Sequence, residues 1–179
     1  SDGDTADAVL SFSIQGKDDK GGVVIPPVDN DDASSDDSSV LVYERDLGTE
    51  AGAVGTGAFT ISATDGIGSL ALGGESFTVE QLQAATNSEP LIVETEQGTL
   101  RITGYEANSE GTEATVNYEY ELKAAQKHSE QGADRVFDEL AVKVSGIGDS
   151  SAEGTLTVEI VDDVPVAKGD IGGVVTEDA

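Results

Sequence analysis

The chain has no cysteine and few bases: 9 Lys and Arg stand against 36 Asp and Glu among 179 residues, a formal net charge of −27. Nucleic acids and anionic membranes are therefore poor partners, because binding to either requires cations that replace counterions. Without cysteine there are no disulfides, so a secreted domain of this composition needs another cross-link. Calcium is the obvious candidate, since it binds carboxylates and relieves their mutual repulsion.

Aromatic residues make up only 4% of the chain and apolar residues 37%, which predicts a thin, aliphatic core. The 22 glycines and the scarcity of lysine favour strands joined by tight turns over long helices. No run of residues is long and apolar enough to span a bilayer as a helix.

Catalytic chemistry has little support in the sequence. His128 is the only histidine, so every Ser-His or Cys-His triad would depend on one ring that lies in a predicted loop. With 36 acids, any pairing of carboxylates is available and carries no information. No glycine-rich phosphate loop precedes a helix. We therefore predict that the protein is not an enzyme.

The apolar pattern predicts an all-β fold. Alternating residues indicate a hairpin formed by 98–105 and 113–124. Further strands are predicted at 9–14, 40–43, 57–63, 69–72, 91–94, 139–145 and 153–161. One helix is predicted after Thr78, which with Gln81 forms a capping-box pattern and places Leu82 and Ala85 on one face. Seven to nine strands with one short helix insertion predict an antiparallel, Ig-like β-sandwich.

Two echoes within the chain predict a tandem array. "ADAVLSFSI" (6–14) has the same alternation as "AEGTLTVEI" (152–160), and "VYE" (42–44) matches "VTE" (175–177). The alternative is coincidence between short β-patterned strings. The array hypothesis assigns three parts: the closing strand of a preceding module with an acidic linker at 1–39, the β-sandwich at 40–165, and a linker with the first residues of a following module at 166–179. We expect the strand at 9–14 to pack on the sandwich, because it would otherwise expose an apolar edge. The alternative is that these residues are a flexible remnant of the preceding module.

Acidic residues gather at the ends of the predicted domain and in its linkers, where calcium could ligate both sides of a joint. Solvated acidic loops are the alternative for each cluster taken singly. Several calcium ions are predicted, with ligands drawn from Asp2, Asp4, Asp18, Asp19, Asp29, Asp31, Asp32, Glu44, Asp46, Asp134, Asp138, Asp162, Asp163 and Asp170.

A family resemblance covers the chain from about residue 40 to its end. "GTLTVEIVDDVPVAKGD" resembles the closing strand and linker of repeat modules in giant RTX adhesins, the type I-secreted surface proteins of Gram-negative bacteria. "DGIGSLALGGESFTVEQLQA", "GTLRITGY" and "YEYELKAAQKH" resemble the body of such modules, in the same order. One departure is "SGIGDSSAEG", which keeps only Asp149 where these modules carry alternating aspartates, as "SDGDTA" does. A calcium site in that hairpin is therefore in doubt.

The resemblance implies secretion by a type I system, folding on calcium outside the cell, and a place at the cell surface beside neighbouring modules. The helix insertion, the loop at 128–138 and the long first linker favour a module that binds a peptide or protein on another cell. A free C-terminal carboxylate could be held by calcium. We expect the tail at 175–179 to dock in this way among the loops at 44–46 and 128–138, unless it packs by accident or pairs with its own domain. The alternative function is a calcium-stiffened extender.

Overall fold

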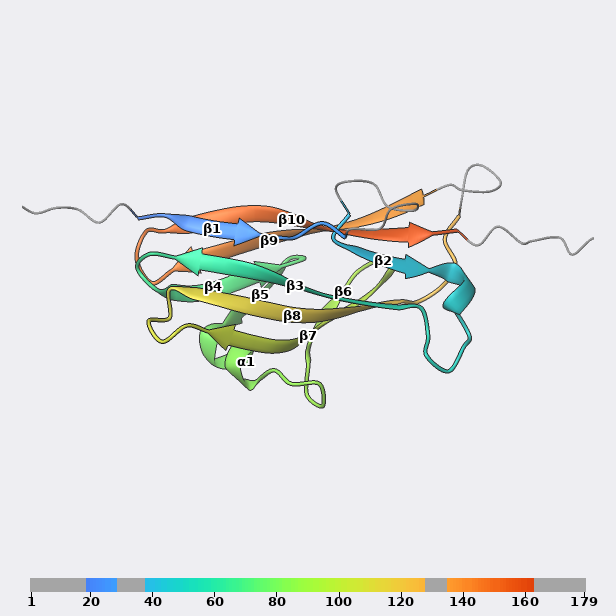
Figure 1. Ribbon diagram of the computed structural model, residues 1–179, viewed down its shortest axis with the longest axis horizontal. Helices are drawn as coiled ribbons and strands as arrows, with labels where there is room; N and C mark the ends of the chain where they lie inside the picture. Colours follow the sequence, from blue (N-terminus) through green and yellow to red (C-terminus); the bar gives the residue numbers. More distant parts are fainter. Residues whose placement is uncertain (1–18, 29–37, 128–134, 163–179) are drawn as a thin grey trace, which may run out of the picture.

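The computed structural model describes residues 19–28, 38–127 and 135–162, and within these ranges strands dominate (Figure 1). The elements in chain order are β1 (Gly21–Val24), β2 (Val40–Tyr43), the 3-10 helix η1 (Glu44–Asp46), β3 (Val54–Ala63), β4 (Ile67–Leu72), β5 (Glu75–Thr78), α1 (Val79–Ala84), β6 (Leu91–Glu94), β7 (Gly98–Ala107), β8 (Glu113–Leu122), β9 (Arg135–Gly146) and β10 (Ser151–Val161).

The strands form two five-stranded sheets that pack face to face. The first sheet has the order β1-β3-β8-β7-β6 and the second the order β2-β10-β9-β4-β5. Every neighbouring pair is antiparallel except β2 and β10, which are parallel. The structure thus confirms the predicted all-β sandwich with one short helix.

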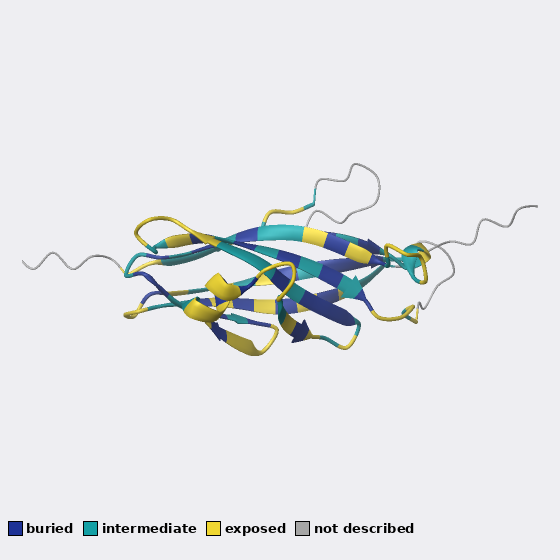
Figure 2. Ribbon diagram, turned by 90° about the horizontal axis from the view of Figure 1, so that it is seen from below, coloured by how far each residue is buried: buried dark blue, intermediate teal, exposed yellow. Residues whose placement is uncertain are grey.

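The core lies between the sheets and is mostly aliphatic, as the composition predicts. Strands alternate buried and exposed residues, so colours change along each ribbon in Figure 2. Two tyrosines of β8 are the largest fully buried side chains. They fit because glycines face them: a Cβ on Gly57 would collide with the ring of Tyr118, and one on Gly98 with that of Tyr120. Small residues on neighbouring strands therefore make room for the few aromatic rings in the core.

The predicted helix is present with its predicted cap. The hydroxyl of Thr78 accepts a hydrogen bond from the backbone N of Gln81, and the Gln81 side chain accepts one from the backbone N of Thr78 at 2.9 Å. Leu82 and Ala85 are buried. Because α1 connects β5 in the second sheet to β6 in the first, it covers one open side of the sandwich.

β1 lies within residues 1–39, which the sequence pattern assigned to the closing strand of a preceding module and an acidic linker. It pairs antiparallel with β3, from Gly21 opposite Ala63 to Val24 opposite Thr60. Val23 and Ile25 pack against the core. β5 is a second strand that the pattern did not predict. The expected strand at 9–14 lies outside the described residues, so its packing stays a prediction.

The described chain enters the sandwich at one end and leaves it at the other (Figure 1). β1 begins beside the start of β10, since a Cβ on Gly21 would collide with the backbone of Ser151. β10 ends at Val161, opposite Tyr43 at the end of β2. We call these the entry end and the exit end. The eleven residues of β10 separate them by about 36 Å, at ~3.3 Å per residue.

Candidate functional site

The exit end carries the loop at 44–46, one of the two loops among which the sequence analysis placed a calcium-bearing pocket; residues 128–134 of the other loop lie outside the described residues. Glu44 and Asp162 each follow the last paired residues of two adjacent parallel strands, Tyr43 and Val161. Glu44 begins η1, and its Oε1 accepts a hydrogen bond from the backbone N of Gln126 at 2.6 Å. η1 is therefore tied to the stretch of chain that leads from β8 towards residue 128.

Other charges at the exit end include both signs. The Arg45 guanidinium lies 4.4 Å from the centroid of the Tyr43 ring and 4.0 Å from the carboxylate of Asp46. Lys123 donates a hydrogen bond to Glu94, and this hydrogen bond lowers the pKa of that carboxyl. These groups are partly or largely exposed, so screening by solvent weakens their attraction.

Five of the predicted calcium ligands lie in the described ranges. Glu44, Asp46 and Asp162 are at the exit end, Asp19 is exposed at the entry end, and Asp138 is buried. Within residues 19–28, 38–127 and 135–162, no three His, Cys, Asp or Glu side chains gather in a way that could hold a metal. The calcium ligands therefore stay a prediction. The others lie outside the described residues: Asp2, Asp4, Asp18, Asp29, Asp31, Asp32, Asp134, Asp163 and Asp170.

Asp138 belongs to a buried cluster between the sheets, which we call the inner cluster: Thr95, Tyr120 and Asp138. Oδ2 of Asp138 accepts hydrogen bonds from the Tyr120 hydroxyl at 2.5 Å and from the Thr95 hydroxyl at 2.6 Å. Burial and the hydrogen bond to Asp138 both raise the pKa of Tyr120. Asp138 comes from the second sheet and the hydroxyls from the first, so this carboxylate links the two sheets.

A second buried carboxylate lies on the outer face of the second sheet. Glu159 is fully buried there, although it follows the outward alternation of β10. Its Oε1 lies 3.0 Å from Nη1 of Arg135 on β9, and its Oε2 accepts a hydrogen bond from the hydroxyl of Ser38. We call Ser38, Arg135 and Glu159 the outer cluster. It fixes the start of β2 to β10.

A third carboxylate organises the entry end. Asp65 follows β3, and its Oδ2 accepts hydrogen bonds from the backbone N of Gly148 at 2.6 Å and of Ser150 at 3.3 Å. Lys20 and Thr64 exchange two hydrogen bonds, at 3.0 and 2.9 Å. The turn after β3 thus holds both the β9–β10 hairpin and the chain as it enters β1. The sequence analysis placed a calcium site in the "SGIGDSSAEG" hairpin in doubt, and in the structure the carboxylate of Asp65 holds this hairpin.

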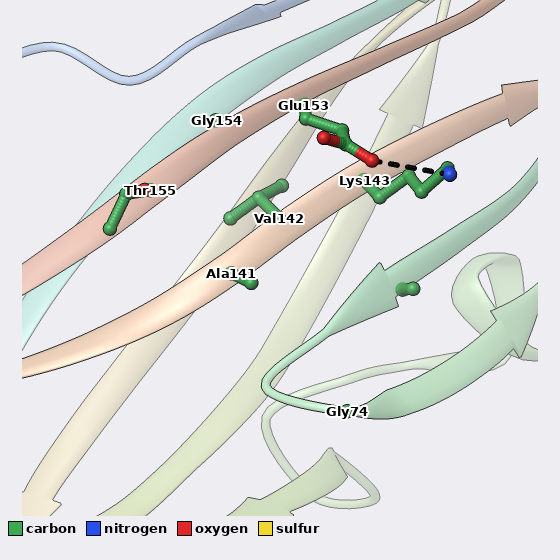
Figure 3. Close-up of a pocket in the computed structure, with 8 residues that line it drawn as sticks. Gly74, Ala141, Val142, Lys143, Glu153, Gly154 and Thr155 are labelled. Carbon is green, nitrogen blue, oxygen red and sulfur yellow. Dashed lines mark ion pairs between the residues drawn. The ribbon is translucent and has the colours of Figure 1, made fainter.

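The outer face of the second sheet carries a shallow groove of about 530 Å³ (Figure 3). Small residues form much of its floor, and an ion pair between Lys143 and Glu153 at 3.2 Å crosses from β9 to β10 beside it. Its lining residues are Ala71, Gly74, Ala141, Val142, Lys143, Glu153, Gly154 and Thr155.

In the part of the chain that the structure describes, no helix has the length and apolar character needed to cross a membrane. Comparisons with family models, curated proteins and solved structures gave no match to this chain. Its class therefore rests on the fold and on the arrangement of its two ends.

Proposed function

We propose that the chain is one link of a tandem array, a non-enzymatic module that projects a calcium-dependent, type I-secreted adhesin of the RTX kind from the cell surface. The observation that supports this is the placement of the chain's entry and exit at opposite ends of the sandwich (Figure 1). Modules joined in this way extend in line, and each adds at least the length of β10 to the array.

The hydrogen bonds at the entry end support the same proposal. Lys20 is held by Thr64, and the neighbouring Asp65 holds the β9–β10 hairpin. The direction in which a preceding module joins is therefore defined from Lys20 onward. At the exit end, Glu44 and Asp162 lie where the following linker begins, so calcium bound there would stiffen that joint.

Small-angle X-ray scattering of a tandem protein made of two and of four copies of the full chain tests the proposal. The maximum dimension should grow by at least about 36 Å per module in calcium. EDTA should shorten the array by freeing the joints, and magnesium at the same concentration is the matched control. Growth by less than half of that length in calcium would show folded-back modules and contradict the in-line arrangement.

Ligand binding is the second candidate, and the contact between Glu44 and Gln126 favours it. This contact brings η1 to the stretch that leads into residues 128–134, the two segments predicted to surround a bound peptide. Short peptides with a free C-terminal carboxylate should then bind in calcium, and their amides should not. Calorimetry that finds equal affinity for acid and amide, or no binding at millimolar peptide, would exclude this function.

A further inference from the structure

The direction of the strands decides how the module responds to tension, if it works in line as proposed above. A pull on the two ends of the chain draws β1 and then β2 towards the entry end, and draws β10 towards the exit end. Because β2 and β10 are parallel, they would have to slide past each other along their length. Their ladder hydrogen bonds lie across the pull, so they are strained together instead of opening one after another.

The start of β2, where the pull arrives, is the most strongly fixed part of this pair. Ser38 donates to Glu159, which also pairs with Arg135 at 3.0 Å. The backbone N of Ser39 donates to the carbonyl of Thr157 at 2.8 Å, and the backbone N of Thr157 donates to the hydroxyl of Ser39 at 3.1 Å. These contacts extend the four paired residues of β2 into the preceding chain.

β1 is held less strongly. It has four paired residues, two of which are Gly21 and Gly22, and Val24 is 65% exposed. From this segment only Val23 and the following Ile25 pack against the core, so few side-chain contacts oppose the movement of β1 along β3. Its detachment would free the chain as far as Ser38, roughly 17 residues or at most about 60 Å of extended backbone, while the outer cluster, β2 and β10 stay joined.

We propose that the parallel β2–β10 pair, fixed at its start by the outer cluster of Ser38, Arg135 and Glu159, is the element that carries tension through the module, and that β1 yields before it. This proposal rests on the in-line function. It can fail while that function stands, because the length of an array in scattering does not depend on how a module resists force.

Single-molecule force spectroscopy on the full chain, held by its two ends between handle proteins, tests the proposal. The wild type should show a short early extension followed by one main unfolding event. Glu159→Gln and Ser38→Ala should each raise the rate of the main event at constant load by about tenfold or more, because each removes a buried, charge-assisted contact. Glu153→Gln is the matched control: it breaks a largely exposed ion pair on the same strand and should leave the rate unchanged.

A second direction of pull separates a mechanical role from general stability. The protein has no cysteine, so one introduced by Glu110→Cys in the turn between β7 and β8 gives a unique attachment point. Pulling from this position and the C-terminus does not load β1 or the start of β2, and Glu159→Gln should then unfold at the wild-type rate.

Three results would each overturn the proposal. The first is that Glu159→Gln weakens the protein equally in both directions of pull, and the second is that Glu159→Gln and Ser38→Ala unfold like the wild type when pulled end to end. The third is that the early extension is absent. Circular dichroism verifies that each variant folds, and Ser38→Ala carries the test if Glu159→Gln does not.

Discussion

The inner and outer clusters bury two carboxylates on adjacent strands in opposite ways. Asp138 is opposite Val158, the residue before Glu159, yet the two side chains lie on opposite faces of the sheet. Between the sheets, Asp138 accepts hydrogen bonds from two neutral donors, the hydroxyls of Tyr120 and Thr95. On the outer face, Glu159 meets the guanidinium of Arg135, which keeps about a third of its surface exposed. Between the two sheets, neutral hydroxyl groups can satisfy a buried carboxylate without the burial of a second charge. On the outer face, a cation can pair with a buried carboxylate because part of the cation's own side chain stays in contact with water.

Asp138→Ala should produce the largest loss of stability. It removes two hydrogen bonds to a charged acceptor and leaves the Tyr120 hydroxyl buried without that partner, so we expect a loss of about 3 kcal/mol in the free energy of unfolding. Urea denaturation measures it. Asp138→Asn keeps the size and one acceptor oxygen, and should cost about half as much. A loss below about 1 kcal/mol for the alanine variant would mean that the inner cluster does not join the sheets.

Glu159→Gln should cost less, about 1.5 kcal/mol, because solvent can compensate the partly exposed Arg135. The same urea experiment in low and high salt sharpens the comparison. Salt should reduce the difference between Glu159→Gln and wild type, and should leave that between Asp138→Asn and wild type nearly unchanged, because only the outer cluster involves an ion pair. Equal responses to salt would contradict the distinction between the clusters.

Alkaline pH tests the buried hydroxyls. Burial raises the pKa of Tyr118 to about 12, and that of Tyr120 is raised as well. Between pH 10 and 12 the unfolded chain releases tyrosine protons that the folded chain retains, so stability present below pH 10 falls as pH rises. We expect a loss of about 1 kcal/mol per buried tyrosine at pH 11. Tyr118→Phe should remove its share of this decline, as measured by unfolding and by tyrosinate absorbance.

Glu94 provides the exposed reference for both clusters. The hydrogen bond from Lys123 lowers its pKa, so its contribution exists above the ordinary pKa of a glutamate and is lost as pH falls. Because the carboxyl is exposed, Glu94→Gln should leave the melting temperature unchanged within error from pH 4 to pH 8. A measurable drop near neutral pH would show that surface pairs contribute as much as the buried ones.

Local pattern was sufficient for most of the fold. Alternation located β2 to β4 and β6 to β10, and the spacing of Thr78 and Gln81 located the helix and its cap. β1 was missed because Gly21 and Gly22 carry no apolar side chain and prolines follow closely. Its strand character depends on the free edge of β3, which no local window contains.

The buried carboxylates were harder to predict because their partners are distant in sequence. Ser38 and Glu159 are 121 positions apart, and Glu159 occupies an outward position that alternation assigns to solvent. Asp138 was singled out for its charge and its place before a strand, but its inward direction follows from the register of β9 with β10. The hydrogen bond between Glu44 and Gln126 was not predicted: the sequence analysis placed only the loops at 44–46 and 128–138 near each other.

The space above Gly154 has a consequence for where this protein can be cut. A Cβ there would lie 2.8 Å from Val23, so β10 is shaped to receive a side chain from the first described strand. A fragment that begins at residue 40 would lose Val23 and Ile25, leave a hollow against β10 and strip β3 of its partner from Thr60 to Ala63. An open strand edge beside an uncovered apolar hollow favours aggregation. The shortest soluble version of this sandwich should therefore start no later than Asp19, twenty-one residues before the boundary that hydrophobic pattern suggests.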